Sequence, residues 1–305
     1  SAVEPSRSGS PLVPIQPEGS APPFFCVHPS GGSVLCYLDL ARLLGTGQPF
    51  YGLQGPDPRS GREPFERIEE MAAVYLAAIR EGGFQGPWRL GGYSFGGCVA
   101  FEMARQLVAA GEEAPFLALL DTRAPLGLDQ QPEGGLVADL AAVLERHALD
   151  DEAANLAEEK ALWDDLTELA EVHLRKVYGE EREPGRRRPS RMGALQRFFR
   201  AYRFLPTGEE IDYREVRRYL RFLRANFRSS RAYAPAAPYP HGAVLFQSTD
   251  RLTDAETAPE VQAGRWRRLV GELEVRPVPG HHLHLLAAPA VEVLARELGR
   301  SLSLV

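Results

Sequence analysis

The sequence GYSFGG at residues 92–97 is the most informative motif in this chain. It follows a short strand-like segment at Trp88–Leu90 and precedes an amphipathic helix pattern at Val99–Ala110. A Gly-x-Ser-x-Gly sequence between a strand and a helix is typical of a nucleophile elbow, a sharp turn that exposes a serine hydroxyl. The flanking glycines suit such a turn, because a Cβ atom at either position would collide with the adjoining strand or helix. Ser94 is therefore the candidate nucleophile, and the start of the following helix offers free N–H groups to an oxyanion.

Strand and helix patterns alternate on either side of this motif. Short apolar runs predict strands, and apolar residues at helical spacing predict helices, at Phe24–Val27, Val34–Leu44, Pro49–Leu53, Ile68–Arg80 and Phe116–Leu120. The last of these runs is continuously apolar, as expected of a strand buried on both faces of a parallel sheet. The alternation predicts an α/β protein with a mostly parallel central sheet flanked by helices.

The alternation stops between about residues 127 and 230, where only helical patterns occur. These patterns cover Leu136–His147, Ala153–Tyr178, Leu195–Phe204 and Tyr213–Phe227. Strand patterns return at Ala243–Phe246 and Leu273–Val275, and a last helix is expected at Ala290–Leu298. We expect a helical insertion within one α/β domain rather than two independent domains.

The N-terminal residues precede the first predicted strand and contain many prolines, six of them within residues 1–23. They show no long apolar stretch and several small polar residues, a composition typical of an extended linker. We therefore predict a linker at residues 1–22 and a domain at residues 23–305, in a chain cut from a longer one.

The overall composition, with 44% hydrophobic and 25% charged residues, is that of a soluble globular protein. No apolar run is long enough to span a membrane, and the N-terminus lacks the features of a signal peptide. The three cysteines are not spaced as zinc ligands, which favours a reduced, cytoplasmic protein without a metal site. A net charge of −6 argues against general nucleic-acid binding.

Charge is distributed in two opposite blocks within the helical insertion. Residues 137–174 carry eleven acidic against two basic residues, a net charge of −9. Residues 175–231 carry seventeen basic against seven acidic residues, a net charge of +10. Such blocks pair with each other across packed helices or, alternatively, the basic block binds an acidic partner or a phosphate.

A serine hydroxyl needs a histidine base held by an acid, and in this fold class the chain order is serine, acid, histidine. Three histidines lie late enough in the chain, His281, His282 and His284. A metal cluster of these histidines would lack a nearby carboxylate or cysteine to complete it. Two acids directly follow predicted strands, Asp121 and Asp250, and the sequence pattern does not choose between them.

Three segments together resemble the terminating thioesterase domains of nonribosomal peptide and polyketide synthases. They are PFFCVHPSGGSVLCY at residues 23–37, GGYSFGG at residues 91–97 and LLDT at residues 119–122. The resemblance extends over about residues 22–125 and 233–286 and does not cover the insertion residue by residue. It implies an α/β-hydrolase fold with a helical lid, at about residues 127–230, inserted before the last strands.

The resemblance also implies the roles of the acid and the base. The acid of the family follows the strand after the nucleophile helix, which favours Asp121 over Asp250. The base of the family lies in a Gly-x-His-x-x-Leu stretch, matched here by residues 280–285 with His282 as the base. Because this stretch contains neighbouring histidines, His281 and His284 are the alternatives.

The loop HPSGG at residues 28–32 resembles the oxyanion loop of the family. The backbone N–H groups of Ser30 and Phe95 are then the expected oxyanion donors, with the N–H of Gly31 as an alternative to that of Ser30. His28 is expected to be structural, since its position requires no imidazole for the chemistry.

The implied substrate is a peptidyl or acyl thioester delivered on the phosphopantetheine of a carrier protein domain upstream in a larger synthase. The domain itself is expected to bind no cofactor. Acyl transfer to Ser94 would be followed by attack of water or of a nucleophile within the chain, giving a free acid, a macrolactone or a macrolactam. The alternatives are a stand-alone carboxylesterase or lipase of the same fold and a non-catalytic binding module.

Overall fold

The computed structural model describes residues 9–57, 60, 62–125, 136–147, 149, 156–178, 213–250 and 258–303. The chain divides into two compact units. The first contains residues 1–130, 225–251 and 258–305, and the second contains residues 131–224 and 252–257. The predicted helix at Leu195–Phe204 lies outside the described residues.

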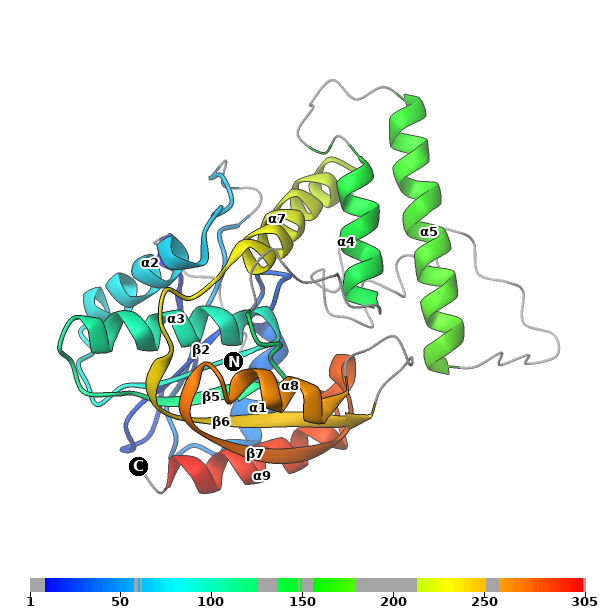
Figure 1. The fold of residues 1–305 in the computed structure, drawn as a ribbon. Helices are drawn as coiled ribbons and strands as arrows, with labels where there is room; N and C mark the ends of the chain where they lie inside the picture. Colours follow the sequence, from blue (N-terminus) through cyan, green and yellow to red (C-terminus); the bar gives the residue numbers. More distant parts are fainter. Residues whose placement is uncertain are drawn as a thin grey trace. The chain divides into compact units, whose positions relative to one another are not determined.

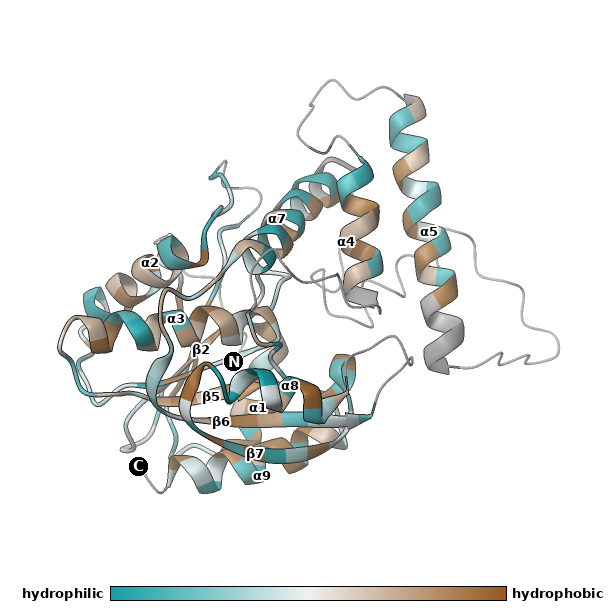
Figure 2. Ribbon diagram, viewed as in Figure 1, coloured by the Kyte–Doolittle hydropathy of each residue, from teal (hydrophilic) through white to brown (hydrophobic). Residues whose placement is uncertain are grey.

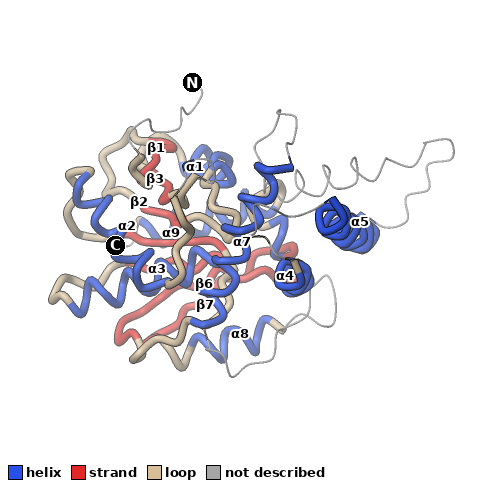
Figure 3. Tube along the Cα trace, turned by 90° about the horizontal axis from the view of Figure 1, so that it is seen from above, coloured by secondary structure: helices blue, strands red, loops and turns tan. Residues whose placement is uncertain are grey.

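The first unit is built on a seven-stranded sheet (Figure 1). Its strand order is β1-β3-β2-β4-β5-β6-β7, and every neighbouring pair is parallel except β1 with β3. Figure 3 shows the strands as one continuous layer from β1 to β7. The strands are β1 (Leu12–Gln16), β2 (Phe24–Val27), β3 (Phe50–Leu53), β4 (Arg89–Tyr93), β5 (Phe116–Leu120), β6 (Tyr239–Asp250) and β7 (Val270–His281). The predicted mostly parallel sheet is confirmed.

Helices cover both faces of this sheet, and each face has its own buried core. On one face lie α2 (Ile68–Glu81), α3 (Phe95–Ala109) and α8 (Pro259–Trp266), whose buried side chains share one hydrophobic cluster. On the other lie α1 (Leu38–Leu44) and α9 (Ala290–Leu302), which share a second cluster. A short 3-10 helix, η1 (Leu35–Tyr37), precedes α1, and another, η3 (His282–His284), follows β7. Figure 2 shows brown, apolar residues along the strands between these helices.

The linker prediction for residues 1–22 is wrong at Leu12–Gln16, which form the edge strand β1. Val13 of this strand is buried, and Pro14 lies opposite Tyr51 of β3. An edge strand tolerates proline because one of its sides needs no ladder hydrogen bond. Helix α8 has no counterpart among the predicted elements.

The second unit contains α4 (Leu136–Arg146), α5 (Leu156–Tyr178) and the first part of α7 (Tyr213–Ala232), which continues into the first unit from Ala225. Buried apolar side chains of the second unit include Leu140, Leu144, Leu162, Leu166 and Leu220. Its acidic block is partly neutralised from within, since Arg146 contacts Asp165 at 2.9 Å. Across the described ranges, no helix combines the length and apolarity needed to cross a bilayer.

Candidate active site

Ser94 lies on the turn between β4 and α3 in a strained backbone conformation, with φ of 56° and ψ of −119°. The glycines around it make this turn possible. A Cβ atom on Gly92 would lie 2.2 Å from the carbonyl oxygen of Gly96, and one on Gly96 would lie 2.3 Å from that of Val27. Real Cβ atoms do not approach backbone this closely, so the turn requires glycine at both positions. Strain of this kind is retained at functional sites, which singles out Ser94.

His282 lies next to this serine, although 188 positions separate them in sequence. It begins η3, directly after β7, and its Nε2 atom lies 3.0 Å from the Ser94 Oγ atom. The imidazole stacks on the ring of Tyr93, with ring centroids 5.0 Å apart and an angle of 29° between the planes. The phenol of Tyr93 donates a hydrogen bond to the carbonyl oxygen of His282. The residue that precedes the serine therefore contacts both the ring and the backbone of this histidine.

Asp121 completes the hydrogen-bonded chain from the end of β5. Its Oδ2 atom lies 2.8 Å from Nδ1 of His282, and its backbone has a positive φ of 45°. Ser248, near the end of β6, donates to the same carboxylate through its N–H at 3.0 Å and its hydroxyl at 2.7 Å. With Nδ1–H donated to a carboxylate, the Nε2 lone pair of His282 is directed at the hydroxyl of Ser94.

The electrostatics of Asp121 favour its charged form. Burial by itself raises the pKa of this carboxyl, but hydrogen bonds from His282 and Ser248 and the charge interaction with His282 outweigh it. The pKa of Asp121 is therefore below its ordinary value. An ionised carboxylate in this position can hold the imidazole in one tautomer and stabilise its cation.

The alternative acid, Asp250, and the alternative bases, His281 and His284, have other contacts. Asp250 is exposed at the end of β6 and accepts a hydrogen bond from Thr249 at 2.8 Å. The rings of His281 and His284 lie against each other, with centroids 4.2 Å apart. Burial lowers the pKa of both, that of His281 to about 4. The structure thus brings Asp121 and His282, and not these alternatives, to Ser94.

The loop at residues 28–32 packs against the start of α3. The ring of His28 stacks on that of Phe95 at 5.8 Å, and Nε2 of His28 accepts a hydrogen bond from the Tyr75 hydroxyl at 2.7 Å. Its Nδ1 atom donates to the carbonyl oxygen of Pro29 at 2.6 Å, which also accepts from the N–H of Gly32 at 2.9 Å. Burial lowers the pKa of His28 to about 4, so the ring is neutral at pH 7. These contacts are those of a structural residue.

Phe95 is the first residue of α3, and its N–H therefore has no acceptor within the helix. Ser30 is buried in the neighbouring loop, and its carbonyl oxygen accepts a hydrogen bond from the side chain of Asn226 at 2.8 Å. Gly96, one residue after Phe95, lies so close to the backbone of Val27 and His28 that it has no space for a side chain. The loop backbone and the N-terminus of α3 are therefore adjacent.

Three contributors were missed by sequence reasoning: Tyr93, Ser248 and Asn226. Tyr93 belongs to the motif itself, but nothing in its spacing indicates a contact with His282. Ser248 is brought to Asp121 because β6 pairs with β5, a neighbour relation that spacing does not reveal. Asn226 lies in the amphipathic pattern of α7, where a polar residue carries no distinguishing signal.

Neither a metal nor a second nucleophile is indicated in the described ranges. No three histidine, cysteine or acidic side chains in these ranges are placed to hold a metal ion together. Cys98 is buried on α3 and its thiol donates to the carbonyl oxygen of Arg123 at 3.3 Å. Burial raises the pKa of this thiol to about 12, which leaves it protonated and unreactive at pH 7.

The chain belongs to the thioesterase domain family, whose sequence profile, described as "Thioesterase domain", matches residues 22–302. It is similar to an atromentin synthetase of Paxillus involutus (invA1), with 40% identity over 111 residues, 36% of this chain and 12% of the relative. It is also similar to the nonribosomal peptide synthetase pngA of Aspergillus terreus, with 40% identity over 112 residues, 37% of this chain and 12% of the relative. The match thus spans a small part of the length of these relatives.

Solved structures show the same fold. The thioesterase domain NocB, in a covalent complex with a fluorophosphonate nocardicin G analogue, covers 95% of this chain and 99% of its own, with a TM-score of 0.58 and 24% identity. The RedJ thioesterase of Streptomyces coelicolor covers 92% and 90%, with a TM-score of 0.59 and 21% identity. The four-domain nonribosomal peptide synthetase holo-AB3403 covers 95% of this chain and 20% of its own, with a TM-score of 0.67 and 24% identity. The expected α/β-hydrolase fold and thioesterase class are confirmed.

Proposed function

We propose that this domain releases a peptidyl or polyketide acyl chain from the phosphopantetheine thioester of an upstream carrier protein domain. The observation that carries the proposal is the hydrogen-bonded chain from Ser94 through His282 to Asp121. Its support comes also from the multidomain synthetases among the similar proteins, including a four-domain nonribosomal peptide synthetase. The phosphopantetheine belongs to the carrier, so the domain itself needs no bound cofactor.

The first half of the proposed reaction is acylation of Ser94. His282 accepts the hydroxyl proton through Nε2 while the Ser94 oxygen attacks the thioester carbonyl, and Asp121 stabilises the imidazolium. The backbone N–H groups of Ser30 and Phe95 hold the oxyanion, a contribution of about 3 kcal/mol per donor in comparable sites. The tetrahedral intermediate collapses with cleavage of the carbon–sulfur bond, and the proton on His282 passes to the sulfur. The carrier thiol departs, and the acyl group remains as an ester on Ser94.

The second half returns the enzyme to its starting state. Water or a hydroxyl or amine within the acyl chain loses a proton to His282 and attacks the ester carbonyl. Collapse of the second intermediate breaks the bond to the Ser94 oxygen, which recovers the proton from His282. The product is a free acid, a macrolactone or a macrolactam according to the nucleophile.

The proposed location of this domain is the cytoplasm. The three cysteines of the chain are all buried, and none of them forms a disulfide. Reduced cysteines support a reducing compartment such as the cytoplasm.

The proposed function is tested by mass spectrometry of products from carrier-bound peptidyl and acyl thioesters. Wild-type protein should release the chain, and Ser94→Ala should abolish both release and the acyl-enzyme mass. Cys98→Ala, which removes a buried thiol one helical turn away, is the matched control and should retain release. Release by Ser94→Ala would refute the nucleophile assignment, and faster turnover of small oxyesters than of carrier thioesters would favour a stand-alone esterase. Ring and hydrolysed products differ by one water.

A further inference from the structure

The loop that carries the proposed oxyanion donor is held by hydrogen bonds to two successive carbonyl groups. The carbonyl oxygen of Pro29 accepts from His28 Nδ1 at 2.6 Å and from the N–H of Gly32 at 2.9 Å. In a planar trans peptide the N–H points opposite to the C=O. The N–H of Ser30 is therefore directed away from the His28 ring and the Gly32 N–H.

The second carbonyl, that of Ser30 itself, is held from a distant part of the chain. The side-chain amide of Asn226 donates to this oxygen at 2.8 Å across 196 positions of sequence. Only the amide nitrogen can donate to a carbonyl, so the partner determines which way the Asn226 amide is turned. Asn226 and Ser30 are 5% and 8% exposed, and the bond is thus formed away from solvent.

Burying the Asn226 amide lowers the stability of the fold unless the amide forms a hydrogen bond. Transferring an unpaired amide out of water costs about 1 to 3 kcal/mol on protein scales, whereas an apolar side chain of similar size would pack without this penalty. Asn226 also belongs to α7, the helix through which the chain returns from the second unit. The bond to Ser30 therefore links this helix to the loop at one defined backbone oxygen.

We propose that Asn226 is a positioning residue for the oxyanion loop. Its bond to the Ser30 oxygen restrains the peptide group that follows the Ser30 Cα atom, and the bonds to the Pro29 oxygen restrain the one that precedes it, so that together they keep the Ser30 N–H aimed at the oxyanion. The proposal rests on the proposed function, in which this N–H stabilises the tetrahedral intermediate. Small displacements of a positioned group lower the rate of the chemical step rather than substrate binding, and about 1 Å can cost about 100-fold.

The test compares Asn226→Leu, which keeps the approximate shape without a donor, with wild-type protein. With carrier-bound thioesters we expect kcat to fall about tenfold or more and KM to change less than about twofold. Phosphonylation of Ser94 by a fluorophosphonate should slow by a similar factor, because its transition state also places negative oxygen at the donors. Ser229→Ala is the control, since the Ser229 hydroxyl bonds within α7 to the Asn226 carbonyl at 3.1 Å and not to the loop. It should leave kcat near the wild-type value.

A second pair of variants separates positioning from folding. The variants Asn226→Gln and Asn226→Met introduce side chains that are similar to each other in length. Only the glutamine keeps an amide donor. The glutamine variant should be faster in kcat and in phosphonylation at similar thermal unfolding midpoints. Equal rates in this pair, or an Asn226→Leu loss that Ser229→Ala reproduces, would overturn the proposal. Wild-type protein that is phosphonylated but releases no carrier-bound chain would refute the proposed function instead, and the phosphonylation rates would still decide the role of Asn226.

Discussion

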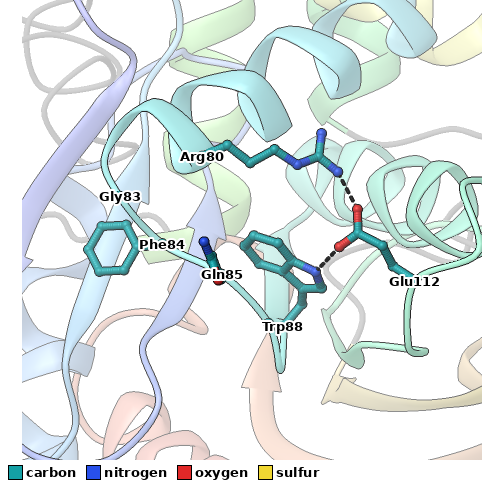
Figure 4. Close-up of a pocket in the computed structure, with 7 residues that line it drawn as sticks. Arg80, Gly83, Phe84, Gln85, Trp88 and Glu112 are labelled. Atoms are coloured by element: carbon teal, nitrogen blue, oxygen red, sulfur yellow. Dashed lines mark hydrogen bonds and ion pairs between the residues drawn. The ribbon is translucent and has the colours of Figure 1, made fainter.

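The two ends of the parallel sheet each carry a hydrogen-bonded trio of side chains, and the trios differ in burial and strain. At the carboxyl end, Ser94, His282 and Asp121 are connected, with the Asp121 side chain 11% and the His282 side chain 25% exposed. At the amino end, Glu112 accepts hydrogen bonds from Trp88 at 2.7 Å and Arg80 at 2.5 Å (Figure 4). The Arg80 and Glu112 side chains are 46% and 34% exposed.

The amino-end trio borders a pocket of about 540 Å³ lined also by Gly83, Phe84 and Gln85. The backbone distinguishes the two ends more sharply than the pocket does. In the described ranges, the non-glycine residues with positive φ are Ser94 and Asp121, both at the carboxyl end. Strained backbone persists only where the surrounding structure demands it, so the carboxyl end is the candidate for chemistry. The amino-end trio has the features of a surface contact between α2 and the loop before β5.

We expect Asp121→Asn to cause the greatest loss of kcat. An amide cannot hold the imidazole of His282 in the required tautomer or stabilise its cation, and we expect kcat to fall about 10⁴-fold. Asp250→Asn, at an exposed position, should change kcat less than about twofold. Steady-state kinetics on a thioester substrate checks both, and the reverse pattern would assign the acid role to Asp250.

Glycine substitutions test how tightly the carboxyl end is packed. Gly96→Ala should lower the free energy of unfolding by at least about 3 kcal/mol, because its Cβ would lie 2.3 Å from a backbone oxygen. Gly47→Ala, in the loop before β3 at the amino end, should change it by less than about 0.5 kcal/mol, since nothing lies within 4 Å of its Cβ. Urea denaturation measures both, and similar losses would contradict the contrast between the ends.

The buried ring of His28, at the carboxyl end, should make the free energy of unfolding depend on pH. Burial lowers its pKa from 6.5 to about 4. As pH falls below 6.5, the unfolded chain binds a proton that the folded ring does not accept until about pH 4. The free energy of unfolding should therefore decrease by up to about 3 kcal/mol between pH 6.5 and 4, and the contribution is fully present above that window.

The measurement is the pH dependence of urea unfolding for wild-type protein and His28→Gln, whose slope in this window should be smaller. His281, whose pKa is also lowered to about 4, acts in the same direction, so His281→Gln provides the comparison. An unchanged slope in His28→Gln would show that the folded ring binds its proton over the same pH range as the unfolded chain.

Tyr93→Phe should produce a smaller effect on the rate. Burial raises the pKa of the Tyr93 phenol, which therefore remains a donor to the His282 carbonyl oxygen. The variant keeps the stacked ring and loses this one bond, so we expect kcat to fall about tenfold, the equivalent of about 1.4 kcal/mol. A kcat equal to that of wild-type protein would show that the stacked ring is sufficient to orient His282.

The smallest effect is expected at the amino end. Glu112→Gln weakens a half-exposed ion pair, and surface pairs contribute about 1 kcal/mol or less. We expect the free energy of unfolding to fall by less than about 1 kcal/mol and kcat to remain unchanged. A large loss of turnover in this variant would mean that the pocket at this end takes part in function.

The fold was predictable where the sequence pattern is local and strong. The helices α2 and α9 have clear apolar periods and the strand β5 is a continuous apolar run, and all three occur close to the predicted positions. Strand β1 was missed because its one proline, the prolines on either side of it and its short length resemble a linker, and its pairing with β3 is a long-range event. The predicted helix at Leu195–Phe204 stays a prediction.

For the candidate site, the pattern alone identified Ser94 and left the acid and the base open. The order of the strands separates the two acids, because β5 lies directly beside β4 and brings Asp121 next to the turn that carries Ser94. Likewise, only the path of the chain after β7 brings the ring of His282, rather than that of His281 or His284, to the Ser94 hydroxyl.

The nucleophile turn follows from local sequence alone, because glycine and serine at fixed spacing act through steric contacts between neighbouring residues. The folded chain selects which carboxylate and imidazole meet the serine, places Ser248 and Tyr93 against them and brings Asn226 to the loop at Ser30. These contacts join residues far apart in the chain, and their distances depend on strand order and packing, which no local pattern contains.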